Sequence, residues 1–342
     1  MSSRERTFGL VTVSLTLLGW SSIPLFLRRL RRSIDAFTSN GVRYGLAALL
    51  WLPALLWARA RGTLPRGLMR AALLPSAFNC AGQVAFALAH YRTEPGLLTF
   101  GMRTQIVFVA LGAAALFPAE RKFLKSPPFL LGMGLVVLGS FGMIVLGGAL
   151  RGATGEGFAL AVLAGVMYAA YGLSVRRNMQ GAPPILAFAA ISQYTAAGML
   201  VLMLLLGERM GLKVLDLPRK EIVLLLGSAV IGIALGHVFY YISIARLGVT
   251  VTAGVIQLQP FCVAAVSYFL FRERLSAPQW ASGGVAVVGA TVLLAVQSRM
   301  ARAQREAEVD ASADSRARVQ DEPAGADARA EAEAPGDSPA RA

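Results

Sequence analysis

The sequence predicts an all-α integral membrane protein in which ten transmembrane helices form two inverted five-helix repeats. Three observations support this prediction. The chain of 342 residues is 56% hydrophobic and only 15% charged, its apolar stretches are long enough to span a bilayer, and its two halves share residues at matching spacing. A soluble domain of this length would carry a larger charged fraction.

Ten apolar segments have about the 20 residues that a helix needs to cross roughly 30 Å of hydrocarbon. They cover approximately residues 8–27, 37–57, 72–91, 96–117, 128–148, 156–175, 184–206, 222–244, 249–271 and 278–297. The first segment ends at Arg28 and Arg29 without a small-residue cleavage site, so we interpret it as a retained helix rather than a signal peptide.

The second half of the chain repeats the first. Glu120 lies 153 residues before Glu273, and an offset of 148 residues places Trp20 opposite Tyr168. Gly134 and Gly139 likewise align with Gly284 and Gly289. Because five is an odd number, the second set of helices must enter the membrane with the opposite orientation. Inverted repeats of this kind allow alternating access to a site near the midplane.

The repeats define the predicted domain organisation. We expect a short cytoplasmic N-terminus at residues 1–7, a first repeat at 8–148, a connecting loop at 149–155, a second repeat at 156–297 and a tail at 298–342. The tail is nearly all Ala, Arg, Asp, Glu, Pro and Ser from residue 301 onward. It lacks the apolar surface that ordered folding requires, so we predict that it is disordered.

The distribution of positive charge predicts the orientation in the membrane. Loops on the N-terminal side carry 15 Lys and Arg residues, against 12 on the other side, which favours cytoplasmic termini. The richness in Ala and Arg suggests a bacterial inner membrane. The net charge of +14 then indicates a partner at the bilayer surface. Nucleic acid is not expected, because no basic stripe with interleaved aromatic residues lies outside the helices.

The segment ARLGVTVTAGVIQLQPFCVAAVSYFLFRERLSAPQWASGGVAVVGATVLL, residues 245–294, resembles the end of an EamA domain of the drug/metabolite transporter superfamily. Glutamine and proline in the penultimate helix, a closing Glu-Arg-Leu and a glycine-rich last helix carry the resemblance, which extends over about residues 8–297. It implies a ten-helix fold and transport of small metabolites, often amino acids outward. The first copy departs from the pattern at Ile106, Val107 and Lys122.

Two arginines lie about seven residues inside predicted helices, which is roughly 10 Å from the helix end. These are Arg43 and Arg103, and their counterparts in the second repeat are Gln193 and, with a one-residue shift, Gln257. A charge at this depth must snorkel, pair or line water. We predict a cavity with one cationic wall that binds a substrate carboxylate. Snorkelling to headgroups and capping of helix ends are the alternatives.

Pro260 predicts a kink near Gln257 and Gln259, because proline lacks the N–H that the helix ladder needs and clashes with the preceding turn. The freed carbonyls and the amide side chains would contact substrate if they line a cavity. If they face a neighbouring helix, they would hold the bundle together instead.

Aromatic residues and one histidine complete the candidate site. His237 near Tyr240 could relay protons, bind substrate or only pack, and the rings of Trp20 and Tyr168 could stack on substrate or anchor helices at the interface. No carboxylate lies in the middle of a predicted segment. Exchange and facilitated diffusion are therefore as consistent with the sequence as proton coupling. No metal or cofactor is expected.

The expected function is an inner-membrane secondary transporter, in the role of exporter, for small metabolites, with amino acids or related carboxylates first. Export of neutral metabolites or cationic drugs is the alternative, followed by a receptor or accessory subunit that does not transport. An enzyme is disfavoured because the chain contains no HExxH and no GxSxG motif. Monomer and homodimer both remain open.

Overall fold

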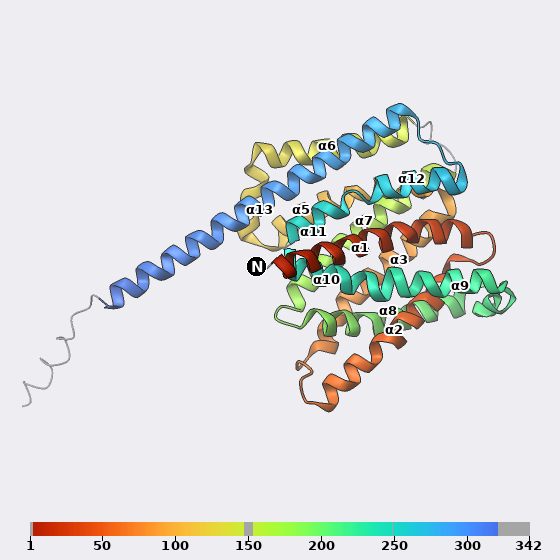
Figure 1. Cartoon of the computed structure of the whole chain (residues 1–342), viewed down its shortest axis with the longest axis horizontal. Helices are drawn as coiled ribbons and strands as arrows, with labels where there is room; N and C mark the ends of the chain where they lie inside the picture. Colours follow the sequence, from red (N-terminus) through yellow and green to blue (C-terminus); the bar gives the residue numbers. More distant parts are fainter. Residues whose placement is uncertain (1–2, 147–152, 248, 321–342) are drawn as a thin grey trace, which may run out of the picture. The chain divides into compact units, whose positions relative to one another are not determined.

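The computed structural model describes residues 3–146, 153–247 and 249–320. The described residues up to Val296 form a bundle of helices joined by short turns (Figure 1). Nine helical segments of the described chain are long and apolar enough to cross a membrane, and Pro127–Met143 is a shorter tenth. The predicted ten-helix membrane fold is confirmed. The end of the fifth predicted segment and much of the loop predicted at 149–155 lie outside the described residues.

The first repeat is helical from its start. Its elements are α1 (Ser3–Leu30), α2 (Ala36–Ala60), α3 (Leu68–Arg92), α4 (Pro95–Gly101), η1 (Met102–Thr104), α5 (Gln105–Leu116), η2 (Pro118–Lys125) and α6 (Pro127–Val145). Asp35 begins α2 as an N-cap, because its carboxylate accepts hydrogen bonds from the N–H groups of Phe37 and Thr38. The carboxylate also accepts from the N–H of Glu208 in the second repeat.

The second repeat has the same order of helices. Its elements are α7 (Ala153–Asn178), α8 (Pro184–Leu206), η3 (Glu208–Asp216), α9 (Arg219–Ser228), the π-helical η4 (Ala229–Leu235), α10 (Gly236–Leu247), α11 (Val249–Ile256), α12 (Gln259–Phe271) and α13 (Ala277–Gln320). Proline in the first turn starts α8 and α12, where its missing N–H costs no hydrogen bond.

The fourth membrane segment of each repeat is broken at an equivalent place. In the first repeat the 3₁₀ turn η1 separates α4 from α5, and in the second a turn at Gln257 and Leu258 separates α11 from α12. Pro260 follows immediately in the first turn of α12. At this turn the N–H groups of Gln257 and Leu258 donate to carbonyl oxygens three residues back, so the α-helical ladder is interrupted while the chain remains helical. Broken helices inside a bundle are found where they line a site, because freed backbone groups need polar partners.

The two repeats interlock. Helix α1 packs against α10 and α12 of the second repeat, and its counterpart α7 packs against α3 and α5 of the first. Helices α2 and α8 pack against each other. The first helix of each repeat thus packs against the third and fourth segments of the other repeat. Such pairing lets each repeat adopt the conformation of the other, as alternating access requires.

Glycines bring the fifth helices of the two repeats together, as the side-by-side course of α6 and α13 in Figure 1 illustrates. A Cβ at Gly289 would lie 2.6 Å from the backbone nitrogen of Val136 and 2.7 Å from the backbone oxygen of Gly132. Only glycine permits this approach, as in other helix pairs packed through small residues.

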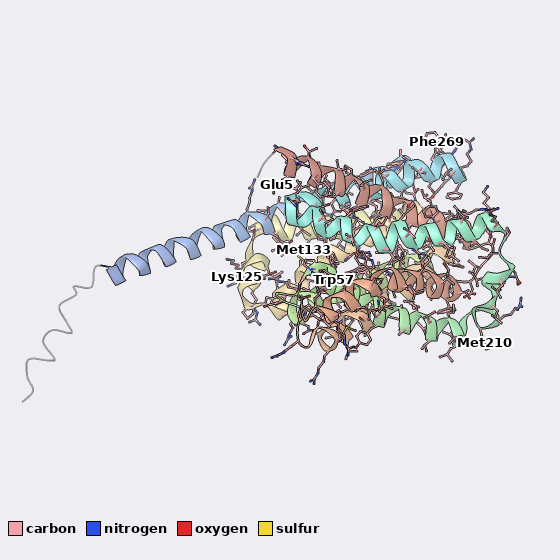
Figure 2. All side chains as sticks on the ribbon, turned by 60° about the horizontal axis from the view of Figure 1, so that its bottom comes forward. Glu5, Trp57, Lys125, Met133, Met210 and Phe269 are labelled. Atoms are coloured by element: carbon pink, nitrogen blue, oxygen red, sulfur yellow. The ribbon has the colours of Figure 1, made fainter. Side chains whose placement is uncertain are left out.

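Large apolar side chains cover the outer surface of the bundle. Phe269 is 73% exposed and Trp57 57% exposed, and Figure 2 labels both among the side chains drawn on the ribbon. A soluble protein rarely exposes so many apolar side chains. This surface is suited to lipid.

The C-terminal part of the chain is a unit of its own, because contacts divide the chain into Met1–Val296 and Gln297–Ala342. Helix α13 extends to Gln320, so residues 298–320 are helical where the sequence predicts disorder. Ala, Arg, Glu and Gln are strong helix formers, and local propensity accounts for the difference. Residues 321–342 lie outside the described chain.

Candidate substrate site

Arg103 lies in η1, at the break of the first repeat, and donates its hydrogen bonds to the break of the second. Its Nη1 lies 3.1 Å from Oε1 of Gln257, and its Nη2 lies 3.1 Å from Oε1 of Gln259. Longer contacts join Nη1 to the carbonyl oxygen of Ile256 and Nε to that of Thr99. The predicted repeat counterparts Arg103 and Gln257 are thus in direct contact.

Gln259 is a member of the site that sequence reasoning placed second, because residues two apart face different directions on a continuous helix. The break between α11 and α12 removes this restriction, so both glutamines reach Arg103. The amide nitrogen of Gln259 also donates to the carbonyl oxygen of Trp20 at 3.0 Å. Three membrane segments therefore meet at one guanidinium group.

The charge of Arg103 is solvated by neutral groups. All four acceptors are amide or carbonyl oxygens. The ion pairs formed among the described residues include neither Arg103 nor Arg43. An arginine within a membrane segment costs several kcal/mol unless water, an anion or polar groups stabilise it. The site consequently carries a positive charge that no carboxylate of the described residues neutralises.

Trp20 connects this polar centre to the π-helical segment η4. Its indole N–H donates to the carbonyl oxygen of Gly232 at 3.1 Å, and that of Trp51 donates to Ala234 at 3.2 Å. A π-helix leaves carbonyl groups out of the usual ladder, and such segments are frequent at functional sites. The tryptophans use the acceptors that the irregular backbone offers.

An aromatic wall lies beside the polar centre. The ring of Trp20 is 5.0 Å from that of Tyr240 and 5.5 Å from that of His237, centroid to centroid. His237 in turn stacks on Phe188 at 4.6 Å, and its Nδ1 is 3.0 Å from the carbonyl oxygen of Ile233. Since a carbonyl only accepts, Nδ1 carries a proton. Sequence reasoning did not single out Phe188, which has no polar group to mark it.

Trp20 and Tyr168, which the repeat aligns, each pack against a glycine. A Cβ at Gly236 would lie 2.6 Å from Nε1 of Trp20, and one at Gly82 would lie 2.8 Å from the ring of Tyr168. Each aromatic ring lies against a glycine of a third helix, α10 or α3, of the opposite repeat. Because glycine has no side chain, Gly236 and Gly82 leave the space that the two rings fill.

Arg43 and Gln193 are placed differently from Arg103. Arg43 is only 2% exposed and interacts with Tyr44, Tyr91 and Tyr168. Gln193 donates to the carbonyl oxygen of Ala48 at 2.9 Å and so ties α8 to α2. The structure brings together Arg103, Gln257, Trp20, His237 and Tyr240, whereas Arg43 and Tyr168 belong to a second group.

Charged residues close the two ends of the bundle in related ways. At one end, here called the Arg176 end, Arg176 pairs with Glu120 and lies 4.1 Å from the ring of Phe117. At the opposite end of the helices, the Arg28 end, the equivalent Arg28 lies 5.8 Å from the ring of Phe271. Each cation thus covers the fourth membrane segment of the other repeat.

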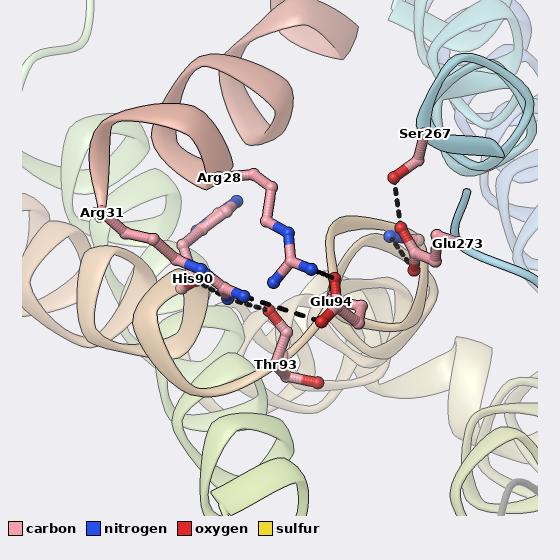
Figure 3. Close-up of polar contacts among 8 residues, drawn as sticks. Arg28, Arg31, His90, Thr93, Glu94, Ser267 and Glu273 are labelled. Carbon is pink, nitrogen blue, oxygen red and sulfur yellow. Dashed lines mark hydrogen bonds and ion pairs between the residues drawn. The ribbon is translucent and has the colours of Figure 1, made fainter. Parts of the chain in front are cut away.

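Arg28 and Arg176 differ in the carboxylate with which each one pairs. Arg28 pairs with Glu94 at 2.7 Å, and Arg31 lies 3.6 Å from the same carboxylate and donates to the carbonyl oxygen of His90 (Figure 3). Glu273, the repeat equivalent of Glu120, instead accepts from the N–H of Gly96 at 3.1 Å.

Glu273 also accepts a short hydrogen bond from the hydroxyl of Ser267 (Figure 3). Burial is the main reason that the pKa of Glu273 is raised above its ordinary value, with the charge of Glu94 acting in the same direction. The hydrogen bonds from Ser267 and Gly96 act against it. The Arg28 end therefore holds two carboxylates with different partners.

These features define a multi-pass membrane transporter fold with two repeats, a polar centre at paired helix breaks and charged residues at both ends. The model of the EamA-like transporter family matches residues 7–145 and 155–295. The chain belongs to this family.

Comparison with known structures supports the fold. A solved structure described as "Crystal structure of protein" is similar over 84% of this chain and 97% of its own, with 15% sequence identity and a TM-score of 0.59. No curated protein matches the chain.

Proposed function

We propose that the protein is a secondary transporter that exports small carboxylate-bearing metabolites, amino acids foremost, by alternating access. The observation that carries this proposal is Arg103, a membrane-embedded cation whose hydrogen-bond partners are Gln257, Gln259 and two backbone carbonyls. A carboxylate would replace neutral acceptors by a charged one, which roughly doubles the strength of each hydrogen bond.

The remaining geometry supports the same substrate class. Trp20, Tyr240 and His237 supply an aromatic surface next to the guanidinium group, suited to the apolar part of a small metabolite. A cationic drug is disfavoured here, because it would enter a site with a positive charge and no carboxylate paired to it.

Alternating access is supported by the interlocked repeats and by the unequal ends. Arg28 and Arg31 are 15% and 20% exposed in their network with Glu94, whereas Arg176 and Arg246 are 52% and 42% exposed. In the proposed cycle the two less exposed arginines hold the Arg28 end closed, although Glu94 itself is 40% exposed and Glu120 at the other end is 15% exposed.

Counterflow into proteoliposomes tests the proposal. Vesicles loaded with an unlabelled amino acid are given the labelled one outside, with and without a pH gradient. We expect saturable uptake that competing carboxylates inhibit and the corresponding amides do not. Equal inhibition by carboxylate and amide would favour neutral metabolites, and the absence of flux from folded protein would favour a receptor or accessory subunit.

A further inference from the structure

Arg43 is the most deeply buried cation of the bundle for which the described residues provide no counter-charge. It is 2% exposed and takes part in none of the ion pairs among them. Its Nη1 makes one long hydrogen bond of 3.5 Å to Oδ1 of Asn40. Its Nε has no hydrogen-bond partner within the described chain.

A second polar atom on the same helix face also lacks a partner. Ser39 is fully buried, and its hydroxyl oxygen makes no hydrogen bond to any described residue. Ser39 precedes Arg43 by four positions in α2, so the two side chains are neighbours on the helix surface. Buried polar atoms are nearly always satisfied, and exceptions together indicate a missing water or ion.

Two polar groups near this face, Asn40 and Tyr91, are held by hydrogen bonds and are uncharged. Asn40 is held by a hydrogen bond of 3.0 Å from its amide nitrogen to the carbonyl oxygen of Gln83. The hydroxyl of Tyr91 donates to the carbonyl oxygen of Ile34. Phenols and amides are neutral at physiological pH. Neither side chain can supply the negative charge that a buried guanidinium group requires.

We propose that Arg43 and Ser39 hold a small monovalent anion of the chloride class, which neutralises Arg43 inside the bundle. Arginine offers five N–H donors, of which one makes a hydrogen bond within the described chain, and serine adds an O–H donor. The near-complete burial of both residues leaves no access for a metabolite. The site is therefore distinct from the one at Arg103, and it does not depend on the proposed substrate.

A chloride titration of the purified full-length protein in detergent tests this inference. Thermal unfolding is followed by the loss of helical circular dichroism while chloride replaces gluconate at constant ionic strength. A ligand that binds only the folded state stabilises it by mass action. We expect the midpoint temperature of the wild type to rise with chloride and then saturate.

Variants assign the effect to the site. Arg43→Gln is expected to lose the chloride dependence, and Arg103→Gln is expected to keep it. An unchanged midpoint of the wild type in chloride and gluconate would overturn the proposal, and so would the same chloride response in Arg43→Gln.

Ser39→Ala keeps the charge and tests the site even if Arg43→Gln does not fold. It removes one hydrogen bond to the anion, so the half-saturating chloride concentration should rise about tenfold. An unaltered half-saturating concentration would contradict a site built on Ser39. Both outcomes are independent of transport, so failure here leaves the proposed function to its own test.

Discussion

The guanidinium group of Arg103 and the side-chain amide of Gln257 are hydrogen-bonded at 3.1 Å, although the residues are 154 positions apart and belong to different repeats. Each lies where the fourth membrane segment of its repeat is broken. The contact joins the two halves through a charge and a neutral dipole. A carboxylate entering the site would compete for the same guanidinium group.

A built-in carboxylate should imitate the substrate. Gln257→Glu is nearly isosteric and places a negative charge against Arg103, where two unit charges at 4 Å attract by about 4 kcal/mol at an effective dielectric constant of 20. We expect higher thermal stability together with a loss of carboxylate counterflow of at least about tenfold, because the internal carboxylate occupies the guanidinium group.

Gln193→Glu is the matched control. Gln193 donates to the backbone oxygens of Ala48 and Ala189, and its hydrogen bonds among the described residues include no arginine. The new charge would face a carbonyl, so this variant should be destabilised. Stabilisation in both variants would show that the effect of Gln257→Glu is unrelated to Arg103.

The network at the Arg28 end should control access to the site from that end. Glu94→Gln removes the carboxylate that holds Arg28 and Arg31. In protein whose native cysteines Cys80 and Cys262 are replaced by serine, Ser21→Cys places a thiol next to Trp20 in α1. We expect Glu94→Gln to accelerate maleimide labelling of this thiol several-fold.

Glu156→Gln controls for the loss of a charge at the same end. Its pair with Arg92 is 44% and 68% exposed, and exposed ion pairs contribute little. In this variant, maleimide labelling of the thiol introduced by Ser21→Cys should proceed at the same rate as in protein that retains Glu156. Equal acceleration by both variants would refute a specific role of Glu94 in closing the Arg28 end.

The stability of the folded protein should depend on the protonation of Glu273. Its folded-state pKa is raised above its ordinary value by burial, so the protonated form favours folding. This contribution is fully present below the unfolded-state pKa and is lost as pH rises through the folded-state pKa. Glu273→Gln keeps an acceptor for Gly96 and cannot ionise.

Unfolding midpoints of wild type and Glu273→Gln, compared from acidic to neutral pH, measure this linkage. The stability of the variant relative to the wild type should increase as pH rises through the folded-state pKa and level off above it. A difference that is independent of pH would contradict a raised pKa of Glu273 in the folded protein.

Glycine packing between α6 and α13 gives a prediction about stability alone. Gly289→Ala should lower the free energy of unfolding by about 1–3 kcal/mol, because its Cβ would meet backbone atoms of Val136 and Gly132 that cannot move easily. A Cβ at Gly284 on the same helix would meet nothing within 4 Å. Gly284→Ala should therefore leave stability unchanged or raise it slightly, and equal losses in thermal unfolding would argue against this interface.

The sequence predicted the membrane segments and the repeat because both depend on composition and spacing along the chain. It also paired Arg103 with Gln257, since related halves place equivalent residues near a common axis. It could not place Gln259 beside Arg103, because the position of the second amide depends on the break before Pro260.

The neighbours of a buried arginine were harder to predict than its depth within a membrane segment. Arg43 and Arg103 lie about equally far inside their segments. Arg43 interacts electrostatically with Tyr44, Tyr91 and Tyr168, whereas Arg103 donates to two glutamines of the opposite repeat. The π-helical turn at Ala229–Leu235 was not predicted, and two of its carbonyl groups accept hydrogen bonds from the indole groups of Trp20 and Trp51 on other helices. Such features are set by tertiary contacts rather than by local sequence.

Counterflow by Arg103→Gln in proteoliposomes, measured for an amino acid and for its uncharged amide, tests the central claim most directly. If Arg103 binds the carboxylate, the variant should fold and insert normally, lose transport of the amino acid and no longer distinguish it from the amide. Arg103→Lys, which keeps the charge without the bidentate geometry, should retain part of the preference. An Arg103→Gln variant that still prefers the carboxylate as strongly as the wild type would contradict the account.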